Sequence, residues 1–418
     1  MRAVAAASAL ACLSLTPIEW VIAGGCGLAS VAYAAATLGA VRGLVSLETL
    51  GEVNAAEPAE WPRLSVIVPA CNEASTLGPA LATLLAQDYP NLEVVAIDDR
   101  SEDATGLLLD GLAAQDPRLR VVHIEHLPDG WLGKNHACAR GAEVASGDWL
   151  LFTDGDVLFR ADALRRAVAF AEAYGLDHLV AVPRFVTRGF LERAFVVAFC
   201  VLLSLKARVW ALHRARSGAY IGAGAFNLVR REAYSRAGGH RTLALEVADD
   251  LKLGLVLRRS GARQGAVVSG GLLAVRWQNG LRASMGGLLK NAFAGAEWRW
   301  SMAAVFCSGF AVVGVVPAVT LLVPVALHVK VAASLAWLGW AVLVGAASYE
   351  VSDGLGLEGV AFPVACAALI GVVLTSAAQA TVSGGITWRG TFYPLAALRR
   401  GCVRERDWPA SAAVGWKL

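Results

Sequence analysis

The stretch Leu64-Ser65-Val66-Ile67-Val68-Pro69-Ala70-Cys71-Asn72-Glu73 decides the fold class of this chain. Its first five residues form a short apolar run rich in β-branched side chains, which predicts a buried strand that ends at Pro69. The next segment, 76–86, places its leucines on one helical face and predicts a helix. A buried strand followed at once by such a helix is the first half of a βαβ unit.

The same alternation continues on the C-terminal side of this stretch. Further strands are predicted over 92–97, 119–124, 149–153 and 179–182, with helices through 107–112 and 161–174. Near-continuous apolar strands joined by helices indicate an α/β fold, with a mainly parallel sheet that helices cover on both faces. In open sheets of this type, ligands bind beyond the carboxyl ends of the strands.

Composition excludes two broad classes of protein. The chain has 418 residues, 56% of them hydrophobic and 17% charged, and its mean hydropathy of +0.53 is too high for a purely soluble protein. A formal charge of +3 leaves no basic field for binding a nucleic acid. The eight cysteines form no C-x-x-C pair, so we expect reduced, buried thiols rather than a zinc site or a disulfide scaffold.

The apolar residues gather at the two ends of the chain. Run 20–41 is uncharged and long enough to cross a hydrocarbon core of about 30 Å as a helix. Three similar runs follow near the C-terminus, at 303–327, 331–348 and 359–382. The sequence therefore predicts four membrane crossings.

These runs divide the chain into a predicted N-terminal membrane anchor (1–43), an α/β domain (44–301), C-terminal transmembrane helices (302–384) and a basic tail (385–418). Lysines and arginines of the middle part place it in the cytosol by the positive-inside rule. Three crossings after a cytosolic domain would leave the tail outside, yet its arginines favour the inside. Either one of the apolar runs is re-entrant, or the N-terminal residues make a different number of crossings. We predict that the tail is cytosolic and bound at the membrane interface.

Two pairs of carboxylates lie where predicted strands end. Asp98 and Asp99 close one strand, and Asp154 and Asp156 close another, so both pairs are expected at one crevice. Either pair alone is more often a helix cap or a turn. The Asp154-Gly155-Asp156 turn offers hard oxygen ligands suited to Mg²⁺ or Mn²⁺ that carries a ligand's phosphates.

These residues belong to an ordered set of motifs that resembles family-2 glycosyltransferases. The set comprises Val68-Pro69-Ala70-Cys71-Asn72-Glu73, Ile97-Asp98-Asp99-Arg100-Ser101-Glu102-Asp103-Ala104-Thr105, Thr153-Asp154-Gly155-Asp156, Gly238-Gly239-His240 and Ala248-Asp249-Asp250-Leu251. Segments 130–135 (GWLGKN) and 385–390 (GITWRG) are most similar to membrane-bound members that glycosylate lipids: ceramide, carotenoid and hopanoid-associated glucosyltransferases.

The resemblance implies a GT-A (Rossmann-like) nucleotide-sugar fold and an inverting, metal-dependent transfer. Its nucleotide-sugar positions correspond here to Pro69, Glu73, Asp98, Asp99, Lys134 and Asp154. Its metal positions correspond to Asp156 and Asp154, with Asp156 the expected direct ligand of Mg²⁺ or Mn²⁺. Lys134 would pair with the sugar diphosphate, and a solvated lysine at a helix start is the alternative.

The resemblance also implies a catalytic base, because Asp250 matches the acidic base that takes the proton of the acceptor hydroxyl. Asp249 stands where the family usually has Glu, which keeps the charge and shortens the reach. A helix N-terminus favoured by the macrodipole is the alternative for both aspartates, and it is compatible with the catalytic role.

Processive polysaccharide synthases of the family carry Gln-x-x-Arg-Trp before their membrane helices. The corresponding segment 296–300 (AEWRW) lacks the Gln, which favours transfer of one sugar to one lipid. Arg299 and Trp300 are candidate contacts for the diphosphate or the acceptor, and interfacial anchoring explains them equally well.

Two further segments bear on the acceptor. Run 195–205 is apolar, too short to span a bilayer and flanked by basic residues, so it indicates either a helix in the headgroup region or a buried core helix. The segment 221–227 resembles the family's acceptor-side loop, where Gly222 and Gly224 would leave room for a substrate.

The sequence thus predicts a multi-pass cell-membrane enzyme with a cytosolic catalytic domain that moves a single hexose, glucose from UDP-glucose, to a membrane lipid. A polysaccharide or polyprenyl-phosphate glycosyltransferase is the second interpretation, and a non-catalytic membrane scaffold is the third. The expected partners are a nucleotide sugar (a UDP-hexose), a lipid acceptor and the membrane, without nucleic acid.

Overall fold

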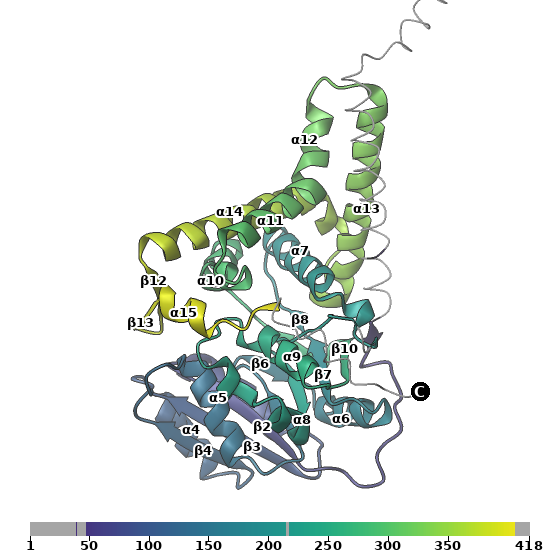
Figure 1. Ribbon diagram of the computed structural model, residues 1–418. Coiled ribbons are helices and arrows are strands. Elements are labelled where there is room, and N and C mark those ends of the chain that lie inside the picture. The colour runs from purple at the N-terminus through teal and green to yellow at the C-terminus, as the bar shows by residue number, and fades with distance from the viewer. Residues whose placement is uncertain (1–38, 40–46, 215–216, 406–418) are drawn as a thin grey trace, which may run out of the picture.

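A computed structural model describes residues 39, 47–214 and 217–405 (Figure 1). Its central sheet has eight strands in the order β1-β10-β7-β9-β5-β2-β3-β4. These strands are β1 (Glu48–Thr49), β2 (Leu64–Ala70), β3 (Leu92–Asp99), β4 (Leu119–Ile124), β5 (Trp149–Phe152), β7 (His178–Val182), β9 (Asn227–Arg230) and β10 (Gln264–Val268). In this described sheet β9 pairs antiparallel with β5 and β7, and all other pairings are parallel. The predicted mainly parallel sheet is confirmed.

Helices cover both faces of this sheet because successive side chains of a strand point to opposite sides. One face carries α3 (Ala74–Leu85), α4 (Thr105–Ala113) and α6 (Ala163–Ala173), and the other carries α5 (Gly133–Val144), α8 (Arg231–Arg236) and α9 (Asp249–Arg259). On β2, Val66 and Val68 pack into the apolar core under α3, α4 and α6, and Ile67 packs into the core under α5, α8 and α9. The buried apolar run of β2 therefore forms the centre of both cores.

Strand register brings the polar strand ends to one edge. Ala70 at the end of β2 lies opposite Asp98 on β3, and Ile67 lies opposite Phe152 at the end of β5. Because these strands are parallel, the residues that follow them emerge on the same side of the sheet.

A second sheet of three strands lies beyond the main one and was not predicted from the sequence. It consists of β6 (Val157–Phe159), β11 (Leu273–Val275) and β8 (Arg184–Phe185), with β11 in the middle. These strands are only two or three residues long, too short for a period-2 pattern to be recognised in the sequence.

The C-terminal half is largely helical. After 3-10 turns η1 (Val209–Ala211) and η2 (Gly239–Leu243), it contains α10 (Leu281–Gly295), α11 (Trp300–Phe310), π-helical η3 (Ala311–Val315), α12 (Val316–Leu322), α13 (Leu327–Ser352), η4 (Leu357–Ala361) and α14 (Phe362–Val382). A hairpin of β12 (Gly385–Trp388) and β13 (Thr391–Pro394) follows, and then α15 (Leu395–Gly401).

Among the described residues, four helical segments are long and apolar enough to cross a membrane: Phe190–Ala211, Trp300–Leu322, Val329–Ser352 and Leu357–Val382. The last three agree with the predicted C-terminal runs. The predicted crossing at 20–41 lies outside the described residues, as do residues 406–418 of the tail. The proposed domain boundaries stay predictions.

The segment 195–205 belongs to a longer helix than expected. Helix α7 runs over Phe190–Ala207, and with η1 it reaches the length of a candidate span, so the expectation that it is too short was wrong. Val197 and Val201 of α7 pack with Trp340 and Leu343 of α13. Helix α7 thus joins the C-terminal apolar helices rather than the core of the sheet.

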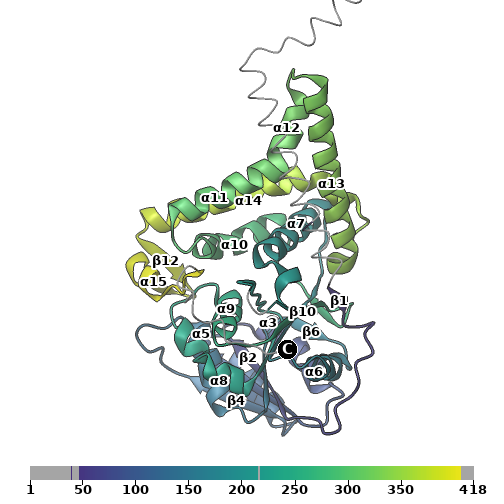
Figure 2. The same cartoon turned by 45° about the vertical axis from the view of Figure 1, so that its right-hand side comes forward.

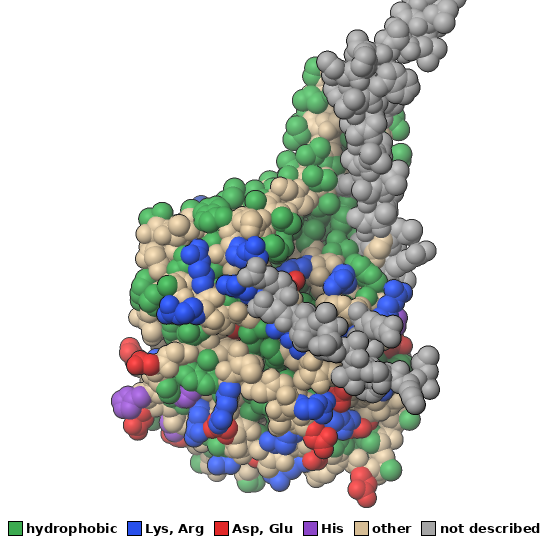
Figure 3. Space-filling view, viewed as in Figure 1, with side chains coloured by type: hydrophobic (Ala, Val, Ile, Leu, Met, Phe, Trp, Pro, Cys, Tyr) green, Lys and Arg blue, Asp and Glu red, His purple; other side chains and the backbone are tan. Residues whose placement is uncertain are grey.

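The apolar helices are arranged in two parts. In both ribbon views α12 and α13 project away from the α/β domain, while α11 and α14 lie side by side above α10 (Figure 2). Hydrophobic side chains gather on the outside of these helices, and most Lys and Arg side chains lie on the lower half of the same face (Figure 3). Helix α10 therefore separates the charged strand ends from the apolar layer.

Candidate active site

The strand-end residues form a charged cluster around Asp154, which follows β5. The Lys134 ammonium at the start of α5 lies 2.8 Å from Oδ1 of Asp154 and 3.6 Å from Oδ2 of Asp249. Burial alone would lower the pKa of Lys134, but Asp154, Asp249 and Asp250 outweigh burial and raise it well above its ordinary value. Lys134 is therefore a fixed cation that joins the Asp154 turn to the start of α9.

Gly224 connects the predicted metal turn to the predicted base. Its N–H donates to Oδ2 of Asp250 over 2.8 Å, and its carbonyl accepts from the N–H of Asp154 over 3.0 Å. A Cβ at this position would lie 2.5 Å from Oδ2 of Asp154. Only a glycine therefore lets the loop touch both aspartates without moving them.

Gly222 has the same requirement on the other side of this loop. A Cβ there would collide with the carbonyl oxygen of Asp250, so the backbone of the loop lies directly on the start of α9. The glycines of 221–227 thus serve close backbone contact in this structure. Room for an acceptor at Gly222 and Gly224 stays a prediction.

Asp249 and Asp250 occupy the first turn of α9, where the helix macrodipole favours carboxylates. Oδ1 of Asp250 accepts from the N–H of Leu251 over 2.7 Å. Burial raises the pKa of Asp249 to about 7, Lys134 opposes that shift, and Asp250 adds to it. Burial likewise raises the pKa of Asp250. A buried carboxylate with a raised pKa is suited to accepting a proton near neutral pH.

Asp156 lies among other carboxylates. Burial, together with the charges of Asp154 and Glu73, raises its pKa to about 6. A divalent cation would relieve this repulsion, so the donor set fits Mg²⁺ or Mn²⁺. Among the described residues, however, no three His, Cys, Asp or Glu side chains are grouped as a ready metal site. With Asp154 engaged by Lys134, Asp156 would be the principal protein ligand, and a bound diphosphate would supply further oxygens.

Glu73 lies on the same edge, directly after β2. Its backbone N–H donates to Thr105 Oγ1 over 2.9 Å, and its carboxylate accepts from Arg389 over 2.7 Å. Pro69 lines a small cavity together with members of the central cluster. The other residues around this cavity are Lys134, Cys138, Phe152, Thr153, Asp154, Gly224, Asn227, His240, Asp249, Asp250 and Leu253.

Asp98 and Asp99 are at the end of β3 as expected, but they do not line that cavity. Asp98 Oδ2 lies 2.9 Å from His123 Nδ1, and the hydrogen bond to Asp98 is the main cause that raises the pKa of His123. Asp99 pairs with the guanidinium of Arg100 through contacts of 2.8 and 3.1 Å. The two predicted carboxylate pairs therefore share an edge of the sheet but have different partners.

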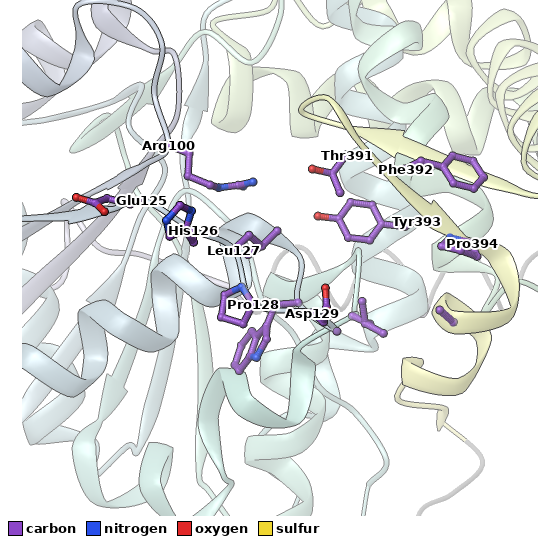
Figure 4. A pocket seen from close by; sticks show the side chains of 14 residues that line it. Arg100, Glu125, His126, Leu127, Pro128, Asp129, Thr391, Phe392, Tyr393 and Pro394 are labelled. Atoms are coloured by element: carbon purple, nitrogen blue, oxygen red, sulfur yellow. The ribbon is translucent and has the colours of Figure 1, made fainter.

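A larger cavity of about 600 Å³ lies beside Arg100. The loop 125–131 after β4 forms one side, and β13 forms the other. Thr391 and Tyr393 are directed across it toward Arg100 and His126 (Figure 4). Its volume is in the range of small-molecule sites.

Trp300 lies against α14 and α10. Its Nε1 donates to Thr381 Oγ1 over 3.2 Å, and its ring is 5.8 Å from that of Phe293. These contacts suit the interfacial alternative, and the role of Arg299 and Trp300 at the diphosphate or acceptor stays a prediction.

Sequence reasoning assigned no role to two cations near the central cluster. Arg389 is in the hairpin turn that reaches Glu73, and Lys290 of α10 acts electrostatically on Asp154. Arg389 belongs to the GITWRG segment, so its motif was visible. Its position beside Glu73, 316 residues earlier in the chain, was not.

Comparison with known proteins agrees with this architecture. Residues 65–238 match the profile described as Glycosyl transferase family 2. The chain is also 29% identical over 195 residues to 4,4'-diaponeurosporenoate glycosyltransferase of Staphylococcus aureus, covering 46% of this chain and 50% of that protein. The chain thus spans about half the length of the curated relatives it matches. The predicted resemblance to family-2 glycosyltransferases is confirmed for residues 65–238.

The similarity to solved structures is weaker. A mannosyltransferase from Pyrobaculum calidifontis in complex with GDP-Man and Mn²⁺ is 20% identical, with 86% of this chain and 88% of that chain covered and a TM-score of 0.47. TarS of S. aureus in complex with UDP-GlcNAc is 17% identical, with 79% and 96% covered and a TM-score of 0.40.

Proposed function

Since residues 65–238 belong to glycosyl transferase family 2, we propose that this chain transfers a single hexose from a nucleotide sugar to a lipid in the membrane. The observation that carries the proposal is the cluster in which Gly224 joins Asp154 to Asp250. The loop at Gly224 thereby holds the candidate base on α9 next to the candidate metal-binding turn after β5.

The proposed reaction is a single displacement with inversion. The acceptor oxygen attacks the anomeric carbon of the sugar, and the bond from that carbon to the diphosphate oxygen breaks, leaving its electron pair on the nucleoside diphosphate. Asp250 takes the proton of the acceptor hydroxyl. Mg²⁺ or Mn²⁺, held by Asp156 and Asp154, would stabilise the charge of the leaving diphosphate.

We propose UDP-glucose as the donor. Lys134 supplies a positive charge at the diphosphate, and Asp249 helps to hold that ammonium in place. Pro69, Glu73, Asp98 and Asp99 are the proposed nucleoside positions, at the carboxyl ends of β2 and β3. The cavity beside Arg100 supports a nucleoside at this edge, since it combines aromatic walls with polar groups.

A membrane lipid is the proposed acceptor because the candidate spans lie directly above the charged edge. Helix α10 packs on α14 and α7, and its Lys290 acts electrostatically on Asp154, so this helix connects the apolar layer with the charged cluster. The similarity to a diaponeurosporenoate glycosyltransferase supports an apolar acceptor. The positive-inside rule supports a multi-pass cell-membrane protein with its catalytic domain in the cytosol.

The second candidate is a polysaccharide or polyprenyl-phosphate glycosyltransferase. The segment 296–300 stands directly before the apolar helices, as the corresponding motif does in the polymer-forming members. The missing Gln counts against this candidate. Its distinguishing product is a chain that grows by many sugars, or a sugar on a polyprenyl phosphate.

The test uses membranes that contain the full chain, a panel of labelled nucleotide sugars and a native lipid extract, with Mg²⁺, with Mn²⁺ and with neither. We expect metal-dependent label in a single-sugar lipid with wild type and with Asp88→Asn, a control at a largely exposed carboxylate. Asp250→Asn should abolish the transfer. Label in a polymer would favour the second candidate, and no label with any donor would contradict both.

A further inference from the structure

The hairpin β12–β13 reaches the charged edge from the far end of the chain. Its turn consists of Arg389 and Gly390, which have φ angles of 47° and 79°, the left-handed pair that a two-residue hairpin turn requires. The N–H of Leu395 donates to the carbonyl of Gly384 over 2.8 Å and fixes the base of the hairpin beneath α14. The turn is therefore held in place by its own strands and by the helix before it.

The turn places a cation over the proposed donor site. The Arg389 guanidinium lies 2.7 Å from Oε1 of Glu73, with side-chain exposures of 31% and 25%. Glu73 in turn approaches the metal turn, because a Cβ on Gly155 would lie 2.7 Å from its Oε2. Arg389 also acts electrostatically on Asp154 and thereby lowers the pKa of that carboxyl.

Lys290 brings a further cation from α10. Its ammonium lies 4.5 Å from the ring centroid of Trp388, the residue before Arg389. Burial lowers the pKa of Lys290, and the like charges of Lys134 and Arg389 lower it further. Within the described parts of the chain, Lys290 forms no ion pair with a carboxylate. An ammonium that other cations repel is stabilised by a bound anion.

Three cations from separate parts of the chain thus contact residues of this charged edge or of its hairpin: Lys134 from α5, Lys290 from α10 and Arg389 from the hairpin. Glu73 and Asp154 each hold one of them, and Lys290 is held by an aromatic ring. Phosphate oxygens can accept from all three, and a guanidinium binds them with two parallel hydrogen bonds.

We propose that Arg389 and Lys290 bind the diphosphate of the nucleotide sugar opposite Lys134, so that the hairpin is the outer wall of the donor site. This inference rests on the proposed function, because it takes the donor to be a nucleotide sugar. It adds α10 and the hairpin to a diphosphate site whose other proposed residues, Lys134, Asp154 and Asp156, lie within the profile-matched residues 65–238.

The test measures how well the full chain in detergent distinguishes a nucleoside diphosphate from a monophosphate. Dissociation constants are determined for UDP, UMP, GDP and GMP, each with Mg²⁺ and with Mn²⁺. The variants are Arg389→Ala, Arg389→Lys and Lys290→Met. The matched control is Arg399→Ala, at an exposed arginine of α15 just after the hairpin.

Wild type should prefer the diphosphate, and Arg399→Ala should keep that preference. Arg389→Ala and Lys290→Met should each reduce it by about tenfold or more, as expected for loss of a hydrogen bond between charged groups. Arg389→Lys should restore part of the preference, because it keeps the charge and loses the two-pronged geometry.

Two results would overturn the inference and leave the proposed function standing. In the first, both variants keep the wild-type ratio of diphosphate to monophosphate affinity. In the second, the melting temperature of the variants falls and their affinity for all four nucleotides decreases by the same factor. That result would mean that the Arg389–Glu73 pair only stabilises the structure. A wild type that binds none of these nucleotides and transfers no sugar would contradict the proposed function and this inference together.

Discussion

The two segments that build the charged crevice do so by different means. In the profile-matched segment (65–238), Glu73, Lys134 and Asp154 lie where buried strands end or where a helix begins. In the C-terminal segment (239–405), Asp250 starts a helix, Lys290 lies within one and Arg389 forms a hairpin turn. The first set is positioned by local βα geometry, and the second by packing between distant parts of the chain. We therefore expect the profile-matched segment to keep its structure when the C-terminal segment is changed. The C-terminal segment should be more sensitive to changes in the profile-matched segment.

The largest effect is expected at the proposed base. Asp250→Asn keeps the shape of the side chain but cannot take the acceptor's proton, so kcat should fall by about 10²- to 10⁴-fold. The affinity for UDP should stay within a few-fold of wild type, because Asp154 and Lys134 are unchanged. If Asp250→Asn keeps a nearly normal kcat, Asp250 is not the base, and the base is to be sought in the profile-matched segment.

Next in size is the loss of a buried ion pair that ties α9 to the end of the described chain. The Lys252 ammonium lies 3.2 Å from Glu297 and donates to the Val403 carbonyl over 2.6 Å, with side-chain exposures of 1% for Lys252 and 6% for Glu297. Lys252→Met leaves the Glu297 carboxylate buried without its partner and should lower the free energy of unfolding by about 3–5 kcal/mol.

Chemical denaturation of the protein in detergent measures this change. The double variant Lys252→Met/Glu297→Gln should recover part of the loss, since it removes both charges and keeps an acceptor for the N–H of Glu405. A loss below about 1 kcal/mol in the single variant, the size expected for an exposed ion pair, would contradict the claim that long-range packing holds the C-terminal segment together.

A smaller effect is expected at the loop that joins the two segments. In Gly224→Ala the new Cβ would displace the Asp154 carboxylate, and a misplacement of about 1 Å can lower kcat by about 100-fold. Gly111→Ala is the matched control, because a Cβ there meets nothing within 4 Å, and alanine is favoured over glycine inside a helix. Equal activity of the two variants would contradict the bridging role of Gly224.

The smallest effect concerns pH. The base must be ionised to act, and burial raises the pKa of Asp250 and takes that of its neighbour Asp249 to about 7. The rate should therefore fall as the pH drops toward and below neutrality, rather than near pH 4. Asp249→Asn removes a like charge beside Asp250 and should move this acid limb down by about one unit.

The profile of kcat against pH, measured at saturating donor, tests this shift. Asp177→Asn, at a carboxylate bound to Arg230 and Arg263 on the α/β domain, is the control and should leave the limb where it is in wild type. If the acid limb moves to higher pH in Asp249→Asn, Asp249 acts on Asp250 mainly by holding Lys134 near it, and not by charge repulsion.

Much of the profile-matched segment could be predicted from the sequence. The run 64–68 predicted a strand because four of its five residues are apolar and a proline follows them, and the end of a strand gives the edge of the sheet to which Glu73 or Asp154 must belong. The strands of the three-stranded sheet were not predicted, because two or three residues are too few to show the alternating pattern of a strand. The positions of Lys290 and Arg389 could not be predicted, since they depend on how α10 and α14 pack. The polar ends of α7 concealed its true length.

The contacts of Lys252 have a consequence for the order in which the protein is made. Lys252 leaves the ribosome well before its partners Glu297 and Val403. At about 5–20 residues per second, the interval before Val403 is synthesised is on the order of ten seconds. During the first part of that interval, until Glu297 has also been made, α9 carries an ammonium without its carboxylate partner. The crevice is therefore complete only after the hairpin and residue 403 have been made, because Arg389 and the Val403 carbonyl come from that part of the chain.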